Sequence, residues 1–118
     1  MKGGEANLMR FLEDPCCLLL VATFNGEPAG QILGYLLKRW DFASPMLFLY
    51  SIDVAEKYRR QGIALKLVEE FNRLGREEGC SETFVLADDT NPPAMSLYHS
   101  AKGIRVFPDQ VMFIWNHD

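Results

Sequence analysis

The residues with the clearest chemical potential lie in the segment 59–64, which contains Arg59, Arg60, Gln61, Gly62, Ile63 and Ala64. From residue 63 onward the apolar side chains recur at helical spacing, so this segment is expected to open a helix. A helix start leaves backbone N–H groups without acceptors and carries partial positive charge, and a glycine there lets an anion come close to the backbone. The segment is therefore predicted to cradle an anion such as a pyrophosphate. The alternative is a solvated basic turn before an ordinary helix.

The elements on either side of this segment support the anion site. The run 46–54 is apolar, rich in aromatic residues and of strand length, and it stops at Asp53 and Val54. The helix is expected to continue to about residue 78, with Gly79 as the residue that follows its last turn. A strand that feeds a helix through a basic glycine turn, without the glycine spacing of a Rossmann or Walker loop, favours anion binding.

A second group of polar residues follows the next predicted strand, 83–87. Because a crossover helix precedes it, this strand should lie parallel to the strand 46–54, and a ligand can bind where such strands diverge. Asp88 and Asp89 lie at that end, and a helix over 94–101 follows with Pro93 near its start. The two aspartates could attract a cation, or they could serve as a turn and cap pair.

The rest of the chain is predicted to form a scaffold for these two regions. Its expected elements are a short helix over 6–12, strands over 17–24 and 29–39 joined at Asn25-Gly26, and a closing hairpin around Pro108-Asp109 with a strand over 111–115. The three strands 17–24, 29–39 and 46–54 are expected to form an antiparallel meander that leads into the basic glycine turn.

Composition narrows the class of protein. The 118 residues are 48% hydrophobic, which predicts one globular domain over 1–118. The net charge of −4 argues against a nucleic-acid partner. No segment is long enough to span a membrane, and we see no signal-peptide pattern. Three cysteines without metal-ligand spacing favour the reducing cytoplasm, and His99 and His117 lack companion ligands, so no metal site is expected.

Two motifs resemble those of the GNAT N-acetyltransferases. Arg59, Gly62 and Ala64 match the family pattern Gln/Arg-x-x-Gly-x-Gly/Ala. The run from Asn91 to Tyr98, closing at Gly103-Ile104, is similar to Asn-x-x-Ala-x-x-Leu-Tyr-x-x-x-Gly-Phe/Ile. The resemblance implies an α/β (α+β) GNAT-like fold, in which a central, mostly antiparallel mixed sheet holds one splayed parallel pair and carries helices on both faces.

The resemblance also implies roles for individual residues. Acetyl-CoA would be the cosubstrate, with its pyrophosphate on the segment 59–64 and its pantetheine amides paired with the backbone from Ile52 to Val54. Asn91 would contact the pantetheine arm, and Tyr98 would be the general acid at the departing sulfur. The residues alone favour the simpler interpretation that Tyr98 is the aromatic of an amphipathic helix.

The chain looks most similar to the aminoglycoside 3-N-acetyltransferase branch, which implies acetyl transfer to a primary amine of a small cationic acceptor. Two departures stand out. Ser51 occupies the position of that branch's carboxylate, and Asp53, two residues on and thus on the same side of the strand, either replaces it or is a plain strand-end acid. The chain also begins where the family's second helix would, so we expect a homodimer that covers the apolar surface left open. Alternatives are a non-catalytic acyl-CoA-binding module and a protein N-acetyltransferase.

Overall fold

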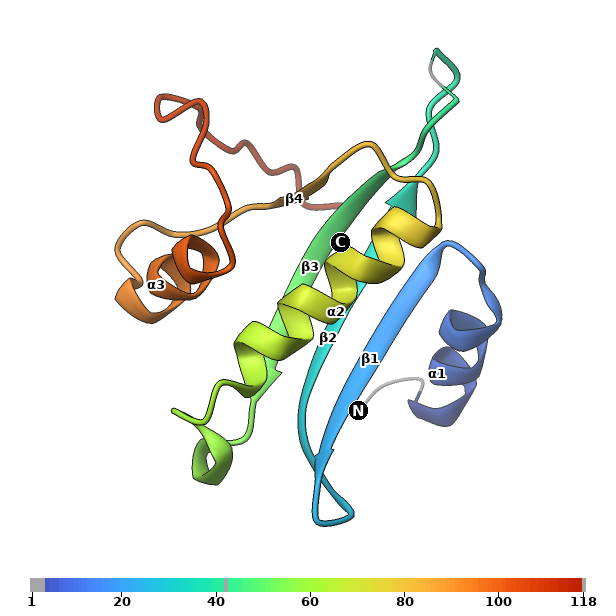
Figure 1. The fold of residues 1–118 in the computed structure, drawn as a ribbon. Coiled ribbons are helices and arrows are strands. Elements are labelled where there is room, and N and C mark those ends of the chain that lie inside the picture. The colour runs from blue at the N-terminus through green and yellow to red at the C-terminus, as the bar shows by residue number, and fades with distance from the viewer. Residues whose placement is uncertain (1–3, 42, 118) are drawn as a thin grey trace.

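The computed structural model describes residues 4–41 and 43–117 (Figure 1). Its elements run in the order α1 (Gly4–Glu13), β1 (Cys17–Phe24), β2 (Glu27–Leu37), β3 (Met46–Val54), the 3-10 helix η1 (Glu56–Tyr58), α2 (Ile63–Glu77), β4 (Thr83–Val85) and α3 (Pro92–Ser100). The predicted helices and strands up to residue 100 are therefore present, with small shifts at their ends.

The strands form one mixed sheet in the order β1-β2-β3-β4. The pairs β1-β2 and β2-β3 are antiparallel, whereas β4 lies parallel to β3 after the crossover through α2. Asn25 and Gly26 make the first hairpin turn with φ angles of 50° and 81°, the left-handed pair that a two-residue hairpin loop requires. The expected mixed sheet with one parallel pair is confirmed.

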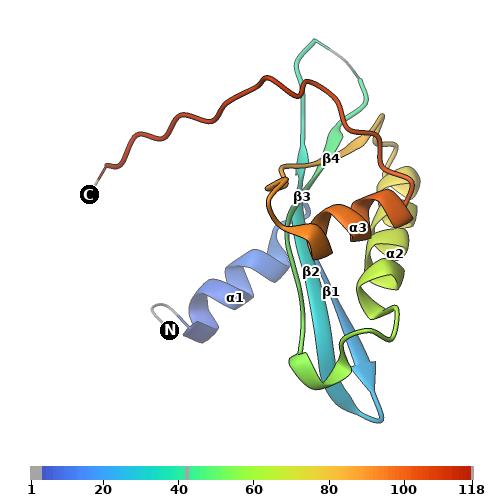
Figure 2. The same cartoon turned by 90° about the vertical axis from the view of Figure 1, so that its left-hand side faces the viewer.

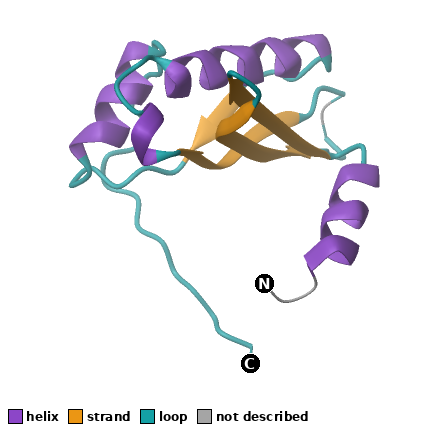
Figure 3. Ribbon diagram, turned by 90° about the horizontal axis from the view of Figure 1, so that it is seen from below, coloured by secondary structure: helices purple, strands orange, loops and turns teal. Residues whose placement is uncertain are grey.

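Helix α2 covers one face of the sheet and closes the core on it (Figure 3). Phe71 of α2 is fully buried together with Ile32 of β2 and Leu47 of β3. Two glycines allow this close approach, because a Cβ on Gly34 would lie 2.5 Å from Cζ of Phe71 and one on Gly75 would lie 2.7 Å from Cδ2 of Leu47. The sequence folds this way because the apolar stripe of α2 coincides with glycines on both packing partners.

Helix α1 lies on the opposite face of the sheet, beside β1, whereas α3 lies on the α2 side (Figure 2). The ring of Phe11 in α1 meets the ring of Tyr35 edge-on, with centroids 5.9 Å apart. The same face carries Phe48 and Phe84, whose rings are stacked at 4.8 Å, and the exposed Tyr50. The expectation of helices on both faces is confirmed.

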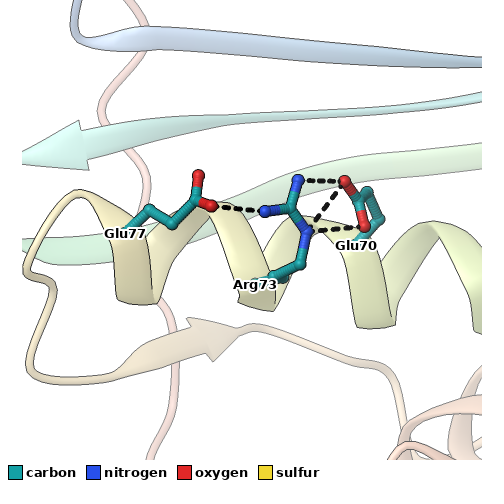
Figure 4. A network of polar contacts seen from close by, with 3 residues as sticks. All are labelled: Glu70, Arg73 and Glu77. Carbon is teal, nitrogen blue, oxygen red and sulfur yellow. Dashed lines mark hydrogen bonds and ion pairs between the residues drawn. The ribbon is translucent and has the colours of Figure 1, made fainter.

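Charged side chains on the solvent face of α2 form ion pairs with one another (Figure 4). Arg73 bridges Glu70, three residues before it, and Glu77, four residues after it. Pairs at these spacings lie side by side on a helix surface and support its C-terminal half.

The closing hairpin predicted from the sequence is wrong. A turn does occur there, in which the N–H of Gln110 donates to the carbonyl oxygen of Phe107 at 3.2 Å. Residues 111–117, however, form no strand and run away from the sheet (Figure 2). Strand β4 is also shorter than expected, because the chain leaves the sheet after Val85. No helix in the described ranges is long and apolar enough to cross a membrane.

Candidate active site

The two parallel strands diverge at their carboxyl ends. Strand β4 pairs with β3 only over three positions, the last of which joins Leu49 to Val85. Strand β3 then continues to Val54, paired with β2 alone. Within the described residues, the backbone of β3 beyond Leu49 therefore has no strand on its β4 side. This includes the segment from Ile52 to Val54, which was predicted to pair with an extended ligand.

A β-bulge in β3 marks the start of this divergence. The pairing with β2 shifts between Leu33, which pairs with Ser51, and Gly34, which pairs with Leu49, so that Tyr50 is the extra residue. A bulge bends its strand and increases the local twist, which turns β3 away from β4. Sequence reasoning missed this feature, because a bulge depends on the partner strand and the strand's own sequence carries no sign of it.

The predicted anion cradle lies at the start of α2. Gly62 is the N-cap residue with φ of 79°, and no described side chain caps the helix. The first intrahelical donor is the N–H of Lys66, which binds the carbonyl oxygen of Gly62, so the N–H groups of residues 63–65 remain available. A Cβ on Gly62 would meet nothing within 4 Å, so the space above the turn is open.

The two arginines of this turn have different surroundings. Nε of Arg59 donates to the carbonyl oxygen of Val54 at 3.0 Å, and its Nη2 lies 3.9 Å from Oδ1 of Asp53. Arg60 has a left-handed backbone with φ of 65°, and its guanidinium has no hydrogen-bond or ion-pair partner in the described part of the chain. Arg59 thus fastens the turn to the end of β3, while Arg60 and Gln61 are exposed beside the helix start.

Asp53 lies on the face of the sheet opposite α2. Val54 is buried in the core that α2 covers, and the neighbouring Asp53 side chain is 77% exposed, as alternation along a strand requires. Ser51 is exposed as well. The expectation that Ser51 and Asp53 share a side of the strand therefore agrees with the burial pattern.

Tyr98 sits on the other side of the sheet, on α3. Asn91 is the N-cap of this helix, since its Oδ1 accepts from the N–H of Ala94 at 3.3 Å, and a proline occupies the first turn. The Tyr98 side chain is half-buried against the core. Burial raises the pKa of its hydroxyl above the ordinary value, so the proton is held more firmly than on a solvated tyrosine.

The predicted acidic pair has local partners. Oδ1 of Asp88 accepts from both the N–H and the hydroxyl of Thr90, and these hydrogen bonds lower the pKa of the Asp88 carboxyl. Asp89 forms an ion pair with Arg105 at 3.1 Å. Both carboxylates therefore stabilise the loop that leads into α3, and each still exposes part of its surface to solvent.

Two cavities adjoin Tyr98. A small one of about 90 Å³, open to solvent, lies between β3, β4, α2 and α3, with Leu49 and Val85 in its wall. A broad, open one of about 1210 Å³ extends around the outer edge of β4 and includes Asp88 and Asp89. Neither cavity includes the cradle at residues 59–64, of which 59–62 are exposed and 63–64 are half-buried against the core.

Asn72 is a polar residue that the sequence reasoning missed. Its Oδ1 is buried without a partner among the described residues, and the residue lines both cavities. The signal was available, because Asn72 follows Val68 by four residues on the buried stripe of α2, where an apolar side chain is expected. An unpaired acceptor oxygen in this position can accept a hydrogen bond from a water molecule or from a ligand.

The structure thus places three kinds of functional group on the elements that adjoin β3 and β4. Available backbone N–H groups lie at the start of α2, a proton-bearing hydroxyl lies on α3, and an exposed carboxylate lies on the far face of β3. Asp53 and Tyr98 flank the divergent strands from opposite faces. An extended ligand that passes between β3 and β4 could therefore contact groups on both faces.

A mixed sheet with one diverging parallel pair and an uncapped helix start agrees with the GNAT-like fold expected from the sequence, and the comparison with known families gives the same class. The chain belongs to the acetyltransferase (GNAT) family, whose model matches residues 3–103.

Individual relatives are more distant. The chain is 30% identical over 87 residues to the thialysine N-epsilon-acetyltransferase of Bos taurus. This match covers 70% of this chain and 51% of that protein. It is 43% identical over 49 residues to the aminoglycoside N(6')-acetyltransferase type 1 of Serratia marcescens, covering 42% and 32% of the two chains. The chain spans about half the length, or less, of these curated relatives.

A solved structure resembles the fold closely. The aminoglycoside acetyltransferase meta-AAC0020 from an uncultured soil metagenomic sample, in complex with sisomicin, superposes with a TM-score of 0.87 at 26% identity. The match covers 96% of this chain and 74% of that one. The aminoglycoside relative named above carries a 6' designation, so the predicted similarity to the 3-N branch is wrong.

Proposed function

We propose that this protein is an acetyl-CoA-dependent N-acetyltransferase that moves an acetyl group to a primary amine of a small cationic acceptor. The observation that supports it most directly is the uncapped start of α2 at Gly62, placed beside the gap between β3 and β4. Backbone N–H groups at a helix start bind phosphate groups well. The gap gives the rest of an extended cosubstrate a path along the unpaired edge of β3.

The residues present fit acetyl-CoA, which supplies the acetyl group as an activated thioester. The N–H groups of residues 63–65 would receive the pyrophosphate, with Arg60 adding a charged contact. No atom lies within 4 Å of where a Cβ on Gly62 would be, so the approach to the helix start is open at this residue. The free backbone from Ile52 to Val54 would hold the pantetheine amides in the manner of an added strand, and the amide of Asn91 would be a further contact.

Tyr98 and Asp53 would handle protons on the two sides of the gap. The hydroxyl of Tyr98 keeps its proton because burial raises its pKa, so it can donate to the sulfur that leaves as a thiolate. The acceptor amine must lose a proton before it attacks, since an alkyl ammonium has a pKa of about 10.4. Asp53 is the candidate for that role, either directly or through a water molecule.

The acceptor is proposed to be a small cation. The names of the relatives place acetylation on an amine nitrogen of thialysine or of an aminoglycoside. The net charge of −4 and the partly exposed carboxylates of Asp88 and Asp89 favour a positively charged acceptor. An aminoglycoside and thialysine are therefore the first candidates.

The test is release of free thiol from acetyl-CoA in the presence of single amines. We expect turnover with at least one member of a panel that contains thialysine, sisomicin and a simple diamine, and none above the hydrolysis background without amine. Tyr98→Phe serves as the matched control for the chemical step. Absence of turnover with every amine, in a protein that binds coenzyme A by calorimetry, would contradict the catalytic proposal.

A non-catalytic acyl-CoA-binding module is the second candidate, and the surroundings of Asp53 favour it. The carboxylate of Asp53, the candidate base, is 77% exposed and lies 3.9 Å from the guanidinium of Arg59, and the exposed Ser51 on the same side of the strand carries only a hydroxyl. Such a module would be stabilised thermally by coenzyme A without amine-dependent thiol release.

We also propose that the chain forms a homodimer. Apolar side chains are exposed along residues 104–115, including Phe113 and Trp115. A surface of this kind usually marks an interface between proteins.

A further inference from the structure

The turn that forms the anion cradle is strained. Between η1 and α2 the chain passes through two residues with left-handed backbones, Arg60 with φ of 65° and Gly62 with φ of 79°. Glycine adopts this conformation readily, whereas for arginine it is unfavourable. Such a turn keeps its shape only where the structure on both sides holds it. On the α2 side, Ile63 and Ala64 pack against the core. The shape of the cradle therefore depends on what anchors η1 at the other side.

Tyr58, the last residue of η1, supplies that anchor. It is only 8% exposed and belongs to the hydrophobic core. Its ring lies against the ring of Phe24, with centroids 5.3 Å apart, and its hydroxyl donates a hydrogen bond to Oε2 of Glu27. Arg59, the first residue of the cradle, follows Tyr58 directly. A shift of Tyr58 would therefore move the cradle.

Glu27 receives a second donor from η1. Nζ of Lys57 lies 2.9 Å from the same Oε2 and 5.1 Å from the centroid of the Tyr58 ring. The hydrogen bonds from Tyr58 and from Lys57 lower the pKa of the Glu27 carboxyl, so this group is ionised at neutral pH and is a strong acceptor. One carboxylate thus holds two consecutive residues of η1.

The sheet fixes the position of this carboxylate. Glu27 is the first residue of β2 and pairs with Phe24 across the first hairpin. The tip of this hairpin and η1 lie side by side at one end of the sheet (Figure 2). No atom lies within 4 Å of where a Cβ on Gly26 would be. The link to η1 therefore runs through the side chain of Glu27 and not through the hairpin turn.

We propose that Glu27 is a positioning residue for the anion cradle. Through Tyr58 and Lys57 it fixes η1, and it thereby directs the available N–H groups of residues 63–65 toward the bound anion. The carboxylate acts without touching that anion. This inference rests on the proposed binding of acetyl-CoA at the cradle, but it does not require that the protein transfer an acetyl group.

The sign of the expected effect separates this role from simple electrostatics. Coenzyme A is a polyanion, so removal of a nearby negative charge should strengthen its binding if charge alone acted. A positioning role predicts the opposite, because loss of the Glu27 carboxylate releases η1 and misaligns the donors of the cradle. A purely structural role would lower the number of binding-competent molecules and leave the affinity of the others unchanged.

The experiment is calorimetric titration with coenzyme A, at a temperature at which circular dichroism shows every variant to be folded. We expect Glu27→Ala and Tyr58→Phe each to weaken binding by about fivefold at unchanged stoichiometry. The double variant Glu27→Ala/Tyr58→Phe should bind about as weakly as Glu27→Ala alone, because the two groups act through one hydrogen bond. Tyr58→Phe keeps the ring that packs in the core, so its folding is not at risk.

A matched control is available at the other end of α2. Glu77→Ala removes a carboxylate of similar exposure, 60% against 57% for Glu27, from its ion pair with Arg73. Its affinity for coenzyme A should stay within about twofold of the unchanged chain. Glu27→Gln keeps an oxygen acceptor for the Tyr58 hydroxyl but offers no charge to Lys57, so it should lose less affinity than Glu27→Ala.

Three results would overturn the inference. Glu27→Ala that binds coenzyme A as tightly as the unchanged chain, or more tightly, would leave the carboxylate no positioning role. A lower stoichiometry at unchanged affinity would give it a role in stability alone. Losses that multiply in the double variant would show that Glu27 does not act through Tyr58.

The proposed function can fail separately. Weaker binding in Glu27→Ala, together with no amine-dependent thiol release in the unchanged chain, would support the inference and contradict acetyl transfer. An unchanged chain that binds no coenzyme A would overturn both. Where an amine is turned over, the KM for acetyl-CoA should rise in Glu27→Ala while kcat and the KM for the amine stay unchanged, and a fall in kcat alone would contradict the positioning role.

Discussion

Nε of Arg59 donates a hydrogen bond to the carbonyl oxygen of Val54 at 3.0 Å, and this contact ties the basic turn to the last residue of β3. The end of the strand and the start of α2 are thereby fixed relative to each other across the intervening 3-10 helix. Part of the Arg59 guanidinium is therefore occupied by a hydrogen bond within the fold. Arg60, which has no such contact, is the guanidinium that remains available to a ligand.

This difference gives the first prediction. Arg60→Ala should weaken coenzyme A binding by about tenfold, the loss of one charge-assisted contact of about 1.5 kcal/mol, and should leave the melting temperature unchanged. Alanine tolerates the left-handed backbone as poorly as arginine does, so the strain at this position is the same in both proteins. Arg59→Ala should weaken binding and also lower the melting temperature. Calorimetry and thermal unfolding separate the two effects, and equal stability losses in both variants would contradict this division.

Gly62 gives the second prediction, through its φ of 79°. Gly62→Ala places a Cβ in open space but forces a left-handed alanine, which costs about 1 kcal/mol and lowers the melting temperature by about 4 °C. Relief of that strain would turn the N–H groups of the first turn away from the anion, so affinity for coenzyme A should fall as well.

A matched control is available at the tip of the first hairpin. Gly26 has φ of 81° and equally open surroundings, so Gly26→Ala carries the same backbone strain far from the cradle. It should lose similar stability and keep full affinity for coenzyme A. If both variants lose affinity alike, the cradle at Gly62 has no special role.

The third prediction concerns Tyr98. Tyr98→Phe removes one oxygen from a half-buried ring, so packing and acetyl-CoA affinity should change little. If the hydroxyl is the general acid, kcat should fall by about a hundredfold. Steady-state kinetics with the best amine of the panel provide the measurement, and Tyr50→Phe, on the opposite face of the sheet, is the control. Unchanged turnover in Tyr98→Phe would remove this residue from the acid role.

The fourth prediction uses the direction of the pKa shift at Tyr98. Burial raises its pKa in the folded protein above the unfolded value of about 10. Its contribution to stability is therefore complete below pH 10 and is lost as the pH rises toward the folded pKa, because the unfolded chain releases the proton first. Tyr98→Phe should lose less stability than the unchanged protein between pH 9 and pH 11. Urea unfolding at several pH values tests this, and parallel curves would contradict it.

The sequence carried enough information to place the helix starts but not to shape the sheet around them. Helical spacing after Gly62 and Pro93 near the start of α3 are local signals, so both helix starts could be predicted, whereas the role of Asn91 as N-cap was not. The extra residue at Tyr50 could not, since a bulge is defined by the pairing of β2 with β3. The strand over 111–115 was also misjudged, because a continuous apolar run indicates a strand without indicating whether the chain's own sheet accepts it.

The bulge leads to the last prediction, at Gly34. A Cβ there would lie 2.1 Å from the carbonyl oxygen of Phe48 and 2.5 Å from Cζ of Phe71, so β2 and β3 would have to separate. Gly34→Ala should cost about 3 kcal/mol by overpacking. Gly75→Ala is the comparison, because its Cβ would lie 2.7 Å from Cδ2 of the buried Leu47 but would meet no backbone atom, and the helix gains about 1 kcal/mol from alanine, which offsets part of the cost. Chemical denaturation should thus show a larger loss for Gly34→Ala than for Gly75→Ala. Comparable losses would mean that the strands around the bulge can adjust, and that the divergence of β3 from β4 is not set by the close contact at Gly34.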